Sequence, residues 1–334
     1  MRLAPRRVAL TVLAVLVAAC GPSSPPPAST ASPSAASSAA AGACPTAADP
    51  GTPAGWGQPG PPAPSIIPVL INDSAELTCG PNRVLFGLID AQSNAPIGGP
   101  DRTVKVALYD LARDPAKPAS NGDAAFIWAI ENVRGVYAVQ GTFSEAGIWG
   151  AEITTMSGIS GEKIRMTFQV SPSSPVVRVG QKAPSTKTPT AADVGGDLAK
   201  ISTDSKPDPA LYKVSVDQAL AKHEPFLLAF ATPKFCVSAQ CGPTLDRLKP
   251  YTAKYPTVQF IHVEPYQLKL QDGQLQPVLT TDNPPNLIPT DVSNTWGLLT
   301  EPWVFVVDRD GVVRDSFELI FSDAELTAAL NAVK

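Results

Sequence analysis

Apolar and polar positions follow two different patterns along the chain. Between about residues 65 and 180, short apolar stretches recur at regular intervals and are separated by clusters of Gly, Pro, Asn and Ser. Regular short strands with such turns predict a β-sandwich. The strands that we expect span residues 66–70, 83–89, 104–109, 125–130, 135–139, 148–154, 163–170 and 176–179.

Beyond residue 210 strands and helices are both expected. The apolar run Phe226–Ala231 predicts a buried strand, and Val258–Glu264 predicts another. Between them Leu245, Leu248 and Tyr251 recur at helical spacing, which predicts a helix. Residues 265–294 are long for a connection and are interpreted as an insertion on the side of the candidate site.

Two further helices have start signals. Ser215 is followed three residues later by Gln218, and Ser322 by Glu325. A hydroxyl followed by Glu or Gln at that distance is a capping box, which predicts a helix start at each serine.

The first residues have the pattern of an export signal. Arg2, Arg6 and Arg7 precede the apolar stretch Val8–Ala19, which is too short to span a bilayer as a helix. The sequence Leu-Val-Ala-Ala before Cys20 resembles the bacterial lipobox, whose cysteine is lipidated. We expect residues 1–19 to be a signal peptide and Cys20 to anchor the protein to the outer face of the cell membrane. An ordinary signal peptide beside an incidental cysteine is the alternative.

Two segments have the composition of linkers. Residues 20–64 are dominated by Pro, Ser, Ala and Gly, which cannot bury enough apolar surface to offset the entropy of ordering. They are predicted to be a disordered tether. Residues 181–209 form a second polar, Pro-rich linker. The resulting domains are a sandwich over 65–180 and a C-terminal domain over 210–334.

The cysteine count is compatible with an exported protein. The chain has five cysteines, and four remain if Cys20 is lipidated. Disulfides persist outside the cytoplasm, so an even number suggests two bonds. We expect Cys44–Cys79 to be a structural disulfide and Cys236–Cys241 to be a reactive pair.

The reactive pair stands where a buried strand gives way to a helix. Free N–H groups and the positive end of the helix dipole favour a thiolate at this position. Four residues separate Cys236 from Cys241, and an i, i+5 pair points to different faces of a helix. A disulfide therefore requires Cys236 to lie outside the regular helix, or the first helical turn to unwind.

This stretch resembles the thioredoxin superfamily, together with Trp296-Gly297 and Glu301-Pro302-Trp303 further along. The resemblance implies an α/β fold with a central mixed sheet flanked by helices, Cys236 as the nucleophile and a cis-proline at Pro302. The substrate groove it implies would be lined by Pro302, Glu301, Trp303, Lys234 and Phe235. The usual motif has two residues between the cysteines, whereas this chain has four.

Other sequence patterns refine this interpretation. The four-residue gap resembles that of Q-type peroxiredoxins, but Ala229 and Pro233 occupy the positions where those enzymes need Pro and Thr, which disfavours a peroxidase. In the sandwich, Gly135-x-Tyr137 and Ala146-Gly147-x-Trp149 resemble immunoglobulin-like modules of the FixH/YtkA type. We expect Tyr137 and Trp149 to be core aromatics.

The function that these patterns favour is thiol–disulfide exchange with protein thiols and disulfides, without a bound cofactor. The chain would need a membrane or secreted redox partner for recycling. One alternative is a copper protein similar to the Sco family, with Cys236, Cys241 and His262 as ligands. The other is an inert disulfide in a degenerate, non-catalytic binding module. His262 itself lies in an apolar strand, which favours a structural histidine.

Charge argues against a nucleic-acid partner. The chain has 26 Lys and Arg against 30 Asp and Glu, and without the three signal arginines 23 basic residues remain. No basic run or aromatic–basic interleaving is present, which phosphate binding would require.

Overall fold

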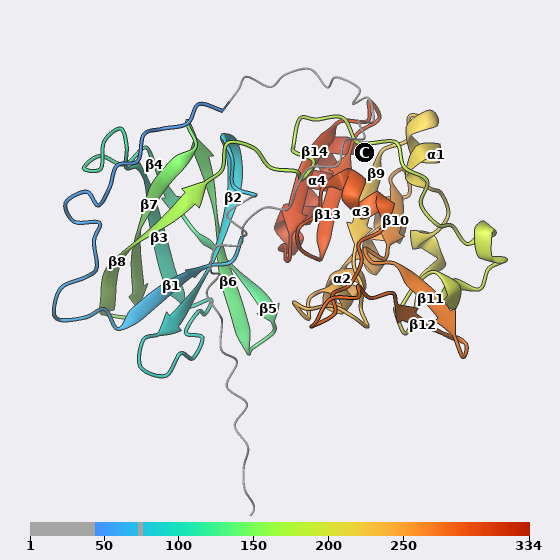
Figure 1. Cartoon of the computed structure of the whole chain (residues 1–334), viewed down its shortest axis with the longest axis horizontal. Coiled ribbons are helices and arrows are strands. Elements are labelled where there is room, and N and C mark those ends of the chain that lie inside the picture. Colours follow the sequence, from blue (N-terminus) through green and yellow to red (C-terminus); the bar gives the residue numbers. More distant parts are fainter. Residues whose placement is uncertain (1–43, 73–75) are drawn as a thin grey trace, which may run out of the picture. The chain divides into compact units, whose positions relative to one another are not determined.

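The computed structural model describes residues 44–72 and 76–334 (Figure 1). The expected signal peptide, Cys20 and the tether as far as residue 43 lie outside the described residues. The strands are β1 (Ile66–Leu70), β2 (Gly80–Asp90), β3 (Arg102–Asp110), β4 (Ser120–Asp123), β5 (Ala125–Ile130), β6 (Arg134–Phe143), β7 (Gly147–Ser157), β8 (Ser160–Val170), β9 (Phe226–Phe230), β10 (Gln259–Val263), β11 (Leu268–Gln271), β12 (Gln274–Pro277), β13 (Trp303–Val307) and β14 (Val313–Glu318). The helices are α1 (Val216–Ala221), α2 (Cys241–Lys254), α3 (Asp291–Trp296) and α4 (Asp323–Val333), with 3-10 turns at Ala192–Val194, Leu198–Lys200 and Pro209–Leu211.

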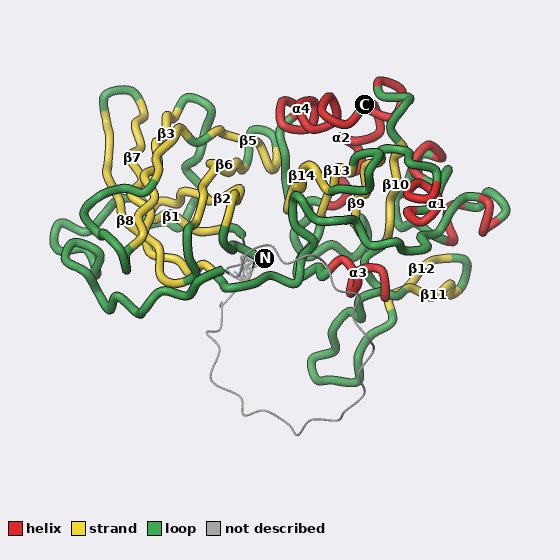
Figure 2. The backbone as a smooth tube through the Cα atoms, turned by 90° about the horizontal axis from the view of Figure 1, so that it is seen from above, coloured by secondary structure: helices red, strands yellow, loops and turns green. Residues whose placement is uncertain are grey.

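Eight strands precede residue 171 and form two antiparallel sheets, with the orders β1-β2-β6-β5 and β4-β3-β7-β8 (Figure 2). Every second residue of a strand points to the same face, so Val104, Val106 and Leu108 of β3 enter one core. Phe86 and Leu88 of the other sheet enter the same core. The two sheets therefore bury their apolar faces against each other.

Seven of the eight expected strands in this region are present, and most are longer than expected. The eighth, at 176–179, is not a strand: Val176 is instead buried beside the C-terminal sheet. The polar strand β4 was missed because its sequence, Ser-Asn-Gly-Asp, has the composition of a turn. Tyr137 and Trp149 are fully buried, so their prediction as core aromatics is confirmed.

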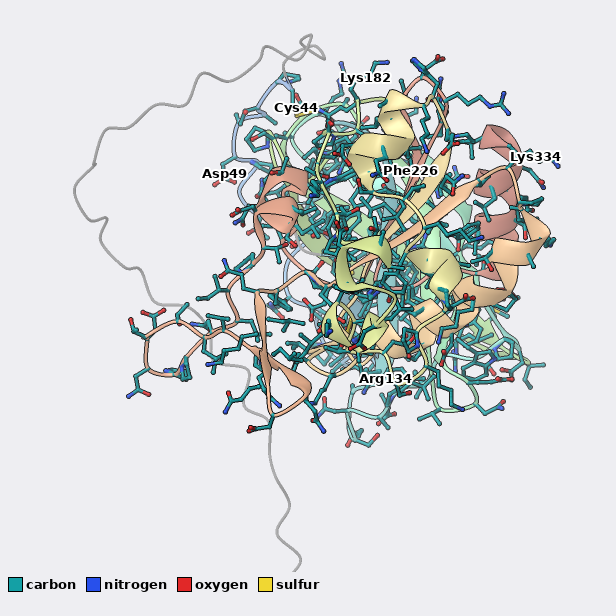
Figure 3. The ribbon with its side chains drawn as sticks, turned by 90° about the vertical axis from the view of Figure 1, so that its right-hand side faces the viewer. Cys44, Asp49, Arg134, Lys182, Phe226 and Lys334 are labelled. Atoms are coloured by element: carbon teal, nitrogen blue, oxygen red, sulfur yellow. A yellow bond between two sulfur atoms is a disulfide. The ribbon has the colours of Figure 1, made fainter. Side chains whose placement is uncertain are left out.

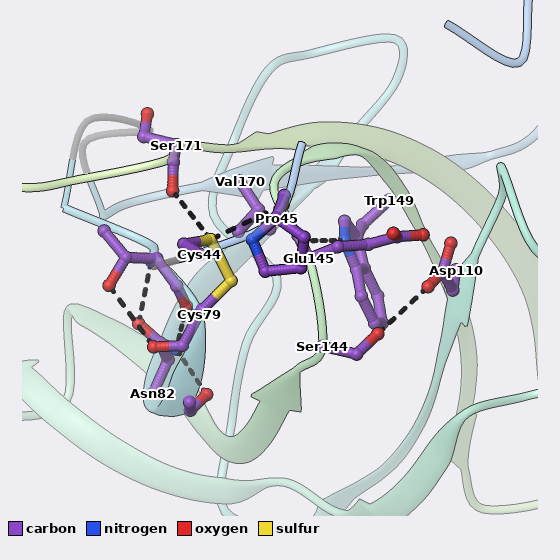
Figure 4. Close-up of a disulfide and its surroundings, with 12 residues drawn as sticks. Cys44, Pro45, Cys79, Asn82, Asp110, Ser144, Glu145, Trp149, Val170 and Ser171 are labelled. Carbon is purple, nitrogen blue, oxygen red and sulfur yellow. Dashed lines mark hydrogen bonds between the residues drawn. A yellow bond between two sulfur atoms is a disulfide. The ribbon is translucent and has the colours of Figure 1, made fainter. Parts of the chain in front are cut away.

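The end of the expected tether packs on these sheets. Cys44 forms a disulfide with Cys79 across a Cα–Cα distance of 5.5 Å (Figure 4). The Ala146 N–H donates to the Pro45 carbonyl at 2.8 Å. Trp56 is 6% exposed and packs edge-on against Tyr109. Residues from Cys44 onward are thus held by backbone and aromatic contacts, although composition alone placed them in the tether.

The C-terminal sheet has the order β10-β9-β13-β14. Strand β9 runs parallel to β10 and antiparallel to β13. All five residues of β9, beginning at Phe226 (Figure 3), are at most 1% exposed, because each face of the strand enters an apolar core. This rigid strand leads directly into the cysteine loop.

The expected fold class, a sandwich followed by an α/β thioredoxin fold, is wrong. The described residues are mostly β, with 37% of them in strands and 16% in helices, and a thioredoxin fold with flanking helices is not evident among them. The connections explain the difference. The Pro-rich segment 181–209 has only short 3-10 turns, since proline lacks the N–H that a helix needs, and residues 265–289 form the hairpin β11–β12. Helices α1 and α3 span only six residues each.

Both predicted capping boxes are confirmed. Ser215 and Gln218 cap the start of α1, and Ser322 and Glu325 cap the start of α4. Within residues 44–72 and 76–334, none of the helices combines the length and hydropathy that crossing a bilayer requires.

Candidate redox site

The two cysteines lie on either side of the point where a loop becomes helix α2. After β9 the chain turns through a hydrogen bond from the Phe235 N–H to the Thr232 carbonyl. Cys236 follows in the loop and is partly exposed, whereas Cys241 is the first residue of α2 and is fully buried. Of the two arrangements that a disulfide would require, the structure has the first, with Cys236 outside the regular helix.

This placement allows a disulfide between residues five apart. The Cα atoms of Cys236 and Cys241 are 6.0 Å apart, and the sulfurs are bonded. Between them Ala239 adopts a left-handed conformation, with φ of 60°, which turns the loop back toward the helix. The pair is therefore accommodated by the loop, and α2 begins at Cys241.

The sulfur of Cys236 receives a hydrogen bond that suits a negative charge. The backbone N–H of Cys241 points at Cys236 Sγ, with a nitrogen–sulfur distance of 3.2 Å. Ser238 Oγ lies 3.3 Å from the same sulfur. Gln240, the N-cap residue, gives no side-chain cap, so the sulfur takes the place of a cap at the helix start. An anionic sulfur here also lies at the positive end of the helix dipole.

A buried carboxylate faces the two sulfurs. Glu301 lies two residues before β13, is 5% exposed and forms a cis peptide bond with Pro302. One carboxylate oxygen of Glu301 and the sulfurs of Cys236 and Cys241 all lie within 4.8 Å of one another. The resemblance implied that Glu301 borders a substrate groove, and the structure places its carboxylate directly beside the two cysteines.

Several hydrogen bonds hold this carboxylate in position. Val237 N–H donates to Glu301 Oε1 at 3.0 Å, and the Tyr266 hydroxyl donates to Oε2. Ser238 Oγ donates to the Glu301 backbone carbonyl at 2.9 Å. The cysteine loop, Tyr266 two residues before β11 and the cis-proline segment are thereby joined around one side chain.

Tyr266 remains a hydrogen-bond donor over the physiological range. Burial raises the pKa of its hydroxyl, and the hydrogen bond to Glu301 and the charge of that carboxylate raise it further. A protonated phenol can stabilise a carboxylate without adding charge. Tyr266 therefore orients Glu301 beside the bonded cysteines.

The other expected groove residues lie in different surroundings. Pro302 is buried, and Trp303 is a core residue that stacks on Phe305. Phe235 is half-buried. The Lys234 ammonium donates to Gln274 on β12 at 3.0 Å, so its hydrogen bond is directed to the hairpin rather than to the sulfurs.

His262 is a structural residue. It is 1% exposed; its Nδ1 lies 2.7 Å from the Tyr212 hydroxyl and its Nε2 lies 2.9 Å from the Ala231 carbonyl. Burial lowers the pKa of this imidazole. Among the described residues, the donor cluster around the cysteines contains Glu301 and not His262. The copper set Cys236, Cys241 and His262 is therefore not assembled.

Sequence reasoning missed Ser238 and Tyr266. Ser238 had a local signal, since a hydroxyl two residues after a reactive cysteine can reach its sulfur. Tyr266 had none beyond its place at the start of a long insertion. Its partner Glu301 is 35 residues away, and only folding brings the two together.

Comparison with known proteins gives little help with identity. No family model matches the chain, and no curated protein matches it. Among solved structures, the PKD domain of the human VPS10 domain-containing receptor SorCS2 is similar over 40% of this chain and 96% of that domain, at 12% identity. The TM-score is 0.17, so this similarity supports no conclusion about fold or function.

Proposed function

We propose that this protein is a thiol–disulfide oxidoreductase of the cell envelope, anchored by a lipid on Cys20, whose Cys236–Cys241 pair exchanges with protein thiols and disulfides. The observation that carries the proposal is the hydrogen bond from the Cys241 N–H to the Cys236 sulfur. This hydrogen bond stabilises a thiolate on Cys236, the more accessible of the two cysteines, when Cys236 is the leaving group. The proposed chemistry depends on this local arrangement and not on a particular fold class.

The exposures of the two cysteines suggest their roles. A thiolate of a substrate protein attacks Cys236, because Cys241 is fully buried. The Cys236–Cys241 bond breaks, a mixed disulfide forms between the substrate and Cys236, and Cys241 leaves as a thiolate. A second substrate thiolate then attacks the substrate sulfur of that mixed disulfide. The substrate disulfide forms, and Cys236 leaves as a thiolate.

The reverse sequence reduces a substrate disulfide, with Cys241 as the resolving cysteine. In either direction the pair must be returned to its starting state by a membrane or secreted redox partner. The two-sheet region between the anchor and the site is proposed to hold the site away from the membrane or to dock a partner.

The first test is the reduction potential of the pair in the purified full chain. The protein is equilibrated in glutathione or dithiothreitol buffers, alkylated and analysed by mass spectrometry of the peptide that carries both cysteines. A potential near about −120 mV identifies an oxidant, and one near about −270 mV identifies a reductant. A bond that remains closed well below about −300 mV is a structural disulfide, and the proposal then fails in favour of a non-catalytic binding module.

A trapping experiment tests the assignment of roles. In a Cys241→Ser variant, Cys236 has no resolving partner, so mixed disulfides with substrate proteins should accumulate. The matched Cys236→Ser variant should trap far less, because its remaining sulfur is buried. Equal trapping by both variants would contradict Cys236 as the nucleophile.

A further inference from the structure

The redox pair has a third potential ligand beside it. We propose that Cys236, Cys241 and Glu301 bind one Zn²⁺ ion when the disulfide is reduced, with the fourth coordination position open to water. This inference goes beyond disulfide exchange and requires only that the pair can be reduced. The three donor atoms already lie within 4.8 Å of one another.

The spacing of the donors suits a tetrahedral ion. Zinc binds thiolate sulfur at about 2.3 Å and carboxylate oxygen at about 2.0 to 2.2 Å. A tetrahedral ion with these bond lengths separates its ligand atoms by roughly 3.5 to 3.8 Å. Small side-chain rotations of Cys236 and Cys241, once their bond is broken, are sufficient to reach those separations. Three protein ligands and a water form an open site.

The mixture of donors selects the metal. Calcium and magnesium take oxygen ligands, so two thiolates disfavour them. Cu(I) prefers soft ligands, so a carboxylate in the set adds little for that ion. Zinc accepts both thiolate and carboxylate. Two thiolates and one carboxylate carry three negative charges in a largely buried space, which a divalent cation offsets.

The hydrogen bonds around the donors resemble the outer shell of a metal site. The Cys241 N–H donates to the sulfur of Cys236. Val237 N–H and the Tyr266 hydroxyl donate to the two oxygens of Glu301, one to each. Each oxygen keeps a lone pair for an ion. Hydrogen bonds of this kind, made to the ligand side chains by their neighbours, orient the ligands and are common in protein metal sites.

Binding and the disulfide exclude each other. When zinc binds the reduced pair, any sulfur that still carries a proton loses it, so up to two protons are released for each ion bound. In the oxidised protein the sulfurs are bonded to one another and no thiolate is present. We therefore expect zinc to bind only the reduced protein and to slow its reoxidation.

The test is a competition titration of the reduced full chain with Zn²⁺ and a chromophoric chelator, in a phosphine reductant. The variant Cys236→Ser/Cys241→Ser keeps Cys20, Cys44 and Cys79 and reports zinc bound by those other thiols. Wild type should bind one more zinc than this variant. Tyr266→Phe should weaken that extra site about tenfold, and Glu301→Gln should weaken it more.

The control Asp246→Asn removes an exposed carboxylate from the same helix and should leave zinc affinity unchanged. The inference is overturned if reduced wild type binds no more zinc than the double variant, or if Glu301→Gln binds as tightly as wild type. Exchange activity is measured separately in metal-free buffer. Exchange without zinc binding refutes this inference alone, and zinc binding without exchange refutes the proposed function alone.

Discussion

The two disulfides of this chain have similar Cα–Cα distances, 5.5 Å and 6.0 Å, and very different surroundings. Cys44–Cys79 joins residues 35 apart and ties an N-terminal segment to the sandwich sheets. Asn82 bonds to backbone groups on both sides of Cys79, which fixes that turn (Figure 4). Cys236–Cys241 closes a loop of five residues beside a helix N-terminus and a buried carboxylate.

The difference lies in the neighbours of each disulfide rather than in the Cα–Cα distance that it bridges. The first pair is surrounded by backbone contacts that hold sequence-distant segments together. The second is surrounded by groups that can stabilise a thiolate or hold an ion. The predictions below test this contrast, beginning with the largest expected effect.

Removing each disulfide by serine substitution should separate the roles of the two pairs completely. Cys236→Ser is expected to reduce disulfide exchange to the uncatalysed background, because no other accessible sulfur receives the Cys241 N–H. Cys44→Ser/Cys79→Ser should retain the exchange rate of wild type. The assay is oxidation or reduction of a model dithiol peptide, and a surviving rate in Cys236→Ser would contradict the contrast.

The free energy of unfolding should depend more on Cys44–Cys79 than on Cys236–Cys241, which is the opposite of the order expected for the exchange rate. A disulfide stabilises by restricting the unfolded chain, and the restriction increases with the length of the closed loop. Loss of Cys44–Cys79 is expected to cost about 4 kcal/mol of unfolding free energy, and loss of Cys236–Cys241 about 2 kcal/mol. Denaturant unfolding of the two double serine variants measures both. Equal losses of unfolding free energy would mean that the disulfide closing the longer loop does not stabilise the fold more than the other.

The sheets that hold the two pairs should also respond differently to pH. Burial, together with the nearby Glu325 carboxylate, raises the pKa of Asp315 on β14 to about 6. The folded state therefore binds this proton more tightly than the unfolded state. Stability from this group is fully present below about pH 4 and is lost as the pH rises through about 6. Asp315→Asn should add about 2 kcal/mol at pH 7.5 and nothing near pH 3.5.

Glu152 in the sandwich is the matched comparison. Burial alone would raise the pKa of this carboxylate, but hydrogen bonds from Lys163 and Arg165 hold it below its usual value. Its contribution is present above the ordinary glutamate pKa and is lost in acid. Glu152→Gln should therefore destabilise at pH 7.5 and have little effect in acid. Thermal unfolding between about pH 3.5 and pH 7.5 compares Asp315→Asn with Glu152→Gln. A stability change of the same sign in both variants at pH 7.5 would contradict the opposite pKa shifts of the two carboxyl groups.

The smallest expected effect concerns the hydroxyl near Cys236. Once the pair is reduced, the Ser238 hydroxyl can turn its one proton from the Glu301 carbonyl to the Cys236 thiolate, so Ser238→Ala should disfavour that thiolate by about 1 kcal/mol. Alkylation of reduced Cys236 at neutral pH should slow about fivefold, which is the equivalent of that free energy. An exposed serine elsewhere in the loops of the sandwich, Ser93, offers a control in the form of Ser93→Ala. An unchanged alkylation rate in Ser238→Ala would show that the Cys241 N–H alone is sufficient to stabilise the Cys236 thiolate.

Local features of the fold were determined by the sequence alone. Alternation of apolar residues located seven strands of the sandwich region, and capping boxes located the starts of α1 and α4. The change from an apolar run to helical spacing located the cysteines between a strand and a helix. These features depend on neighbours within a few residues, which is the range that periodicity and capping report.

Only the tertiary structure decided the rest. The fold class was predicted wrongly because it depends on whether long connections such as 181–209 and 265–289 become helical, and proline and hairpin pairing prevented that. Glu301 meets the cysteine loop across 64 residues, and Tyr266 meets Glu301 across 35. No local pattern encodes such distances. The sequence located the sulfurs, and folding supplied the carboxylate and the phenol that surround them.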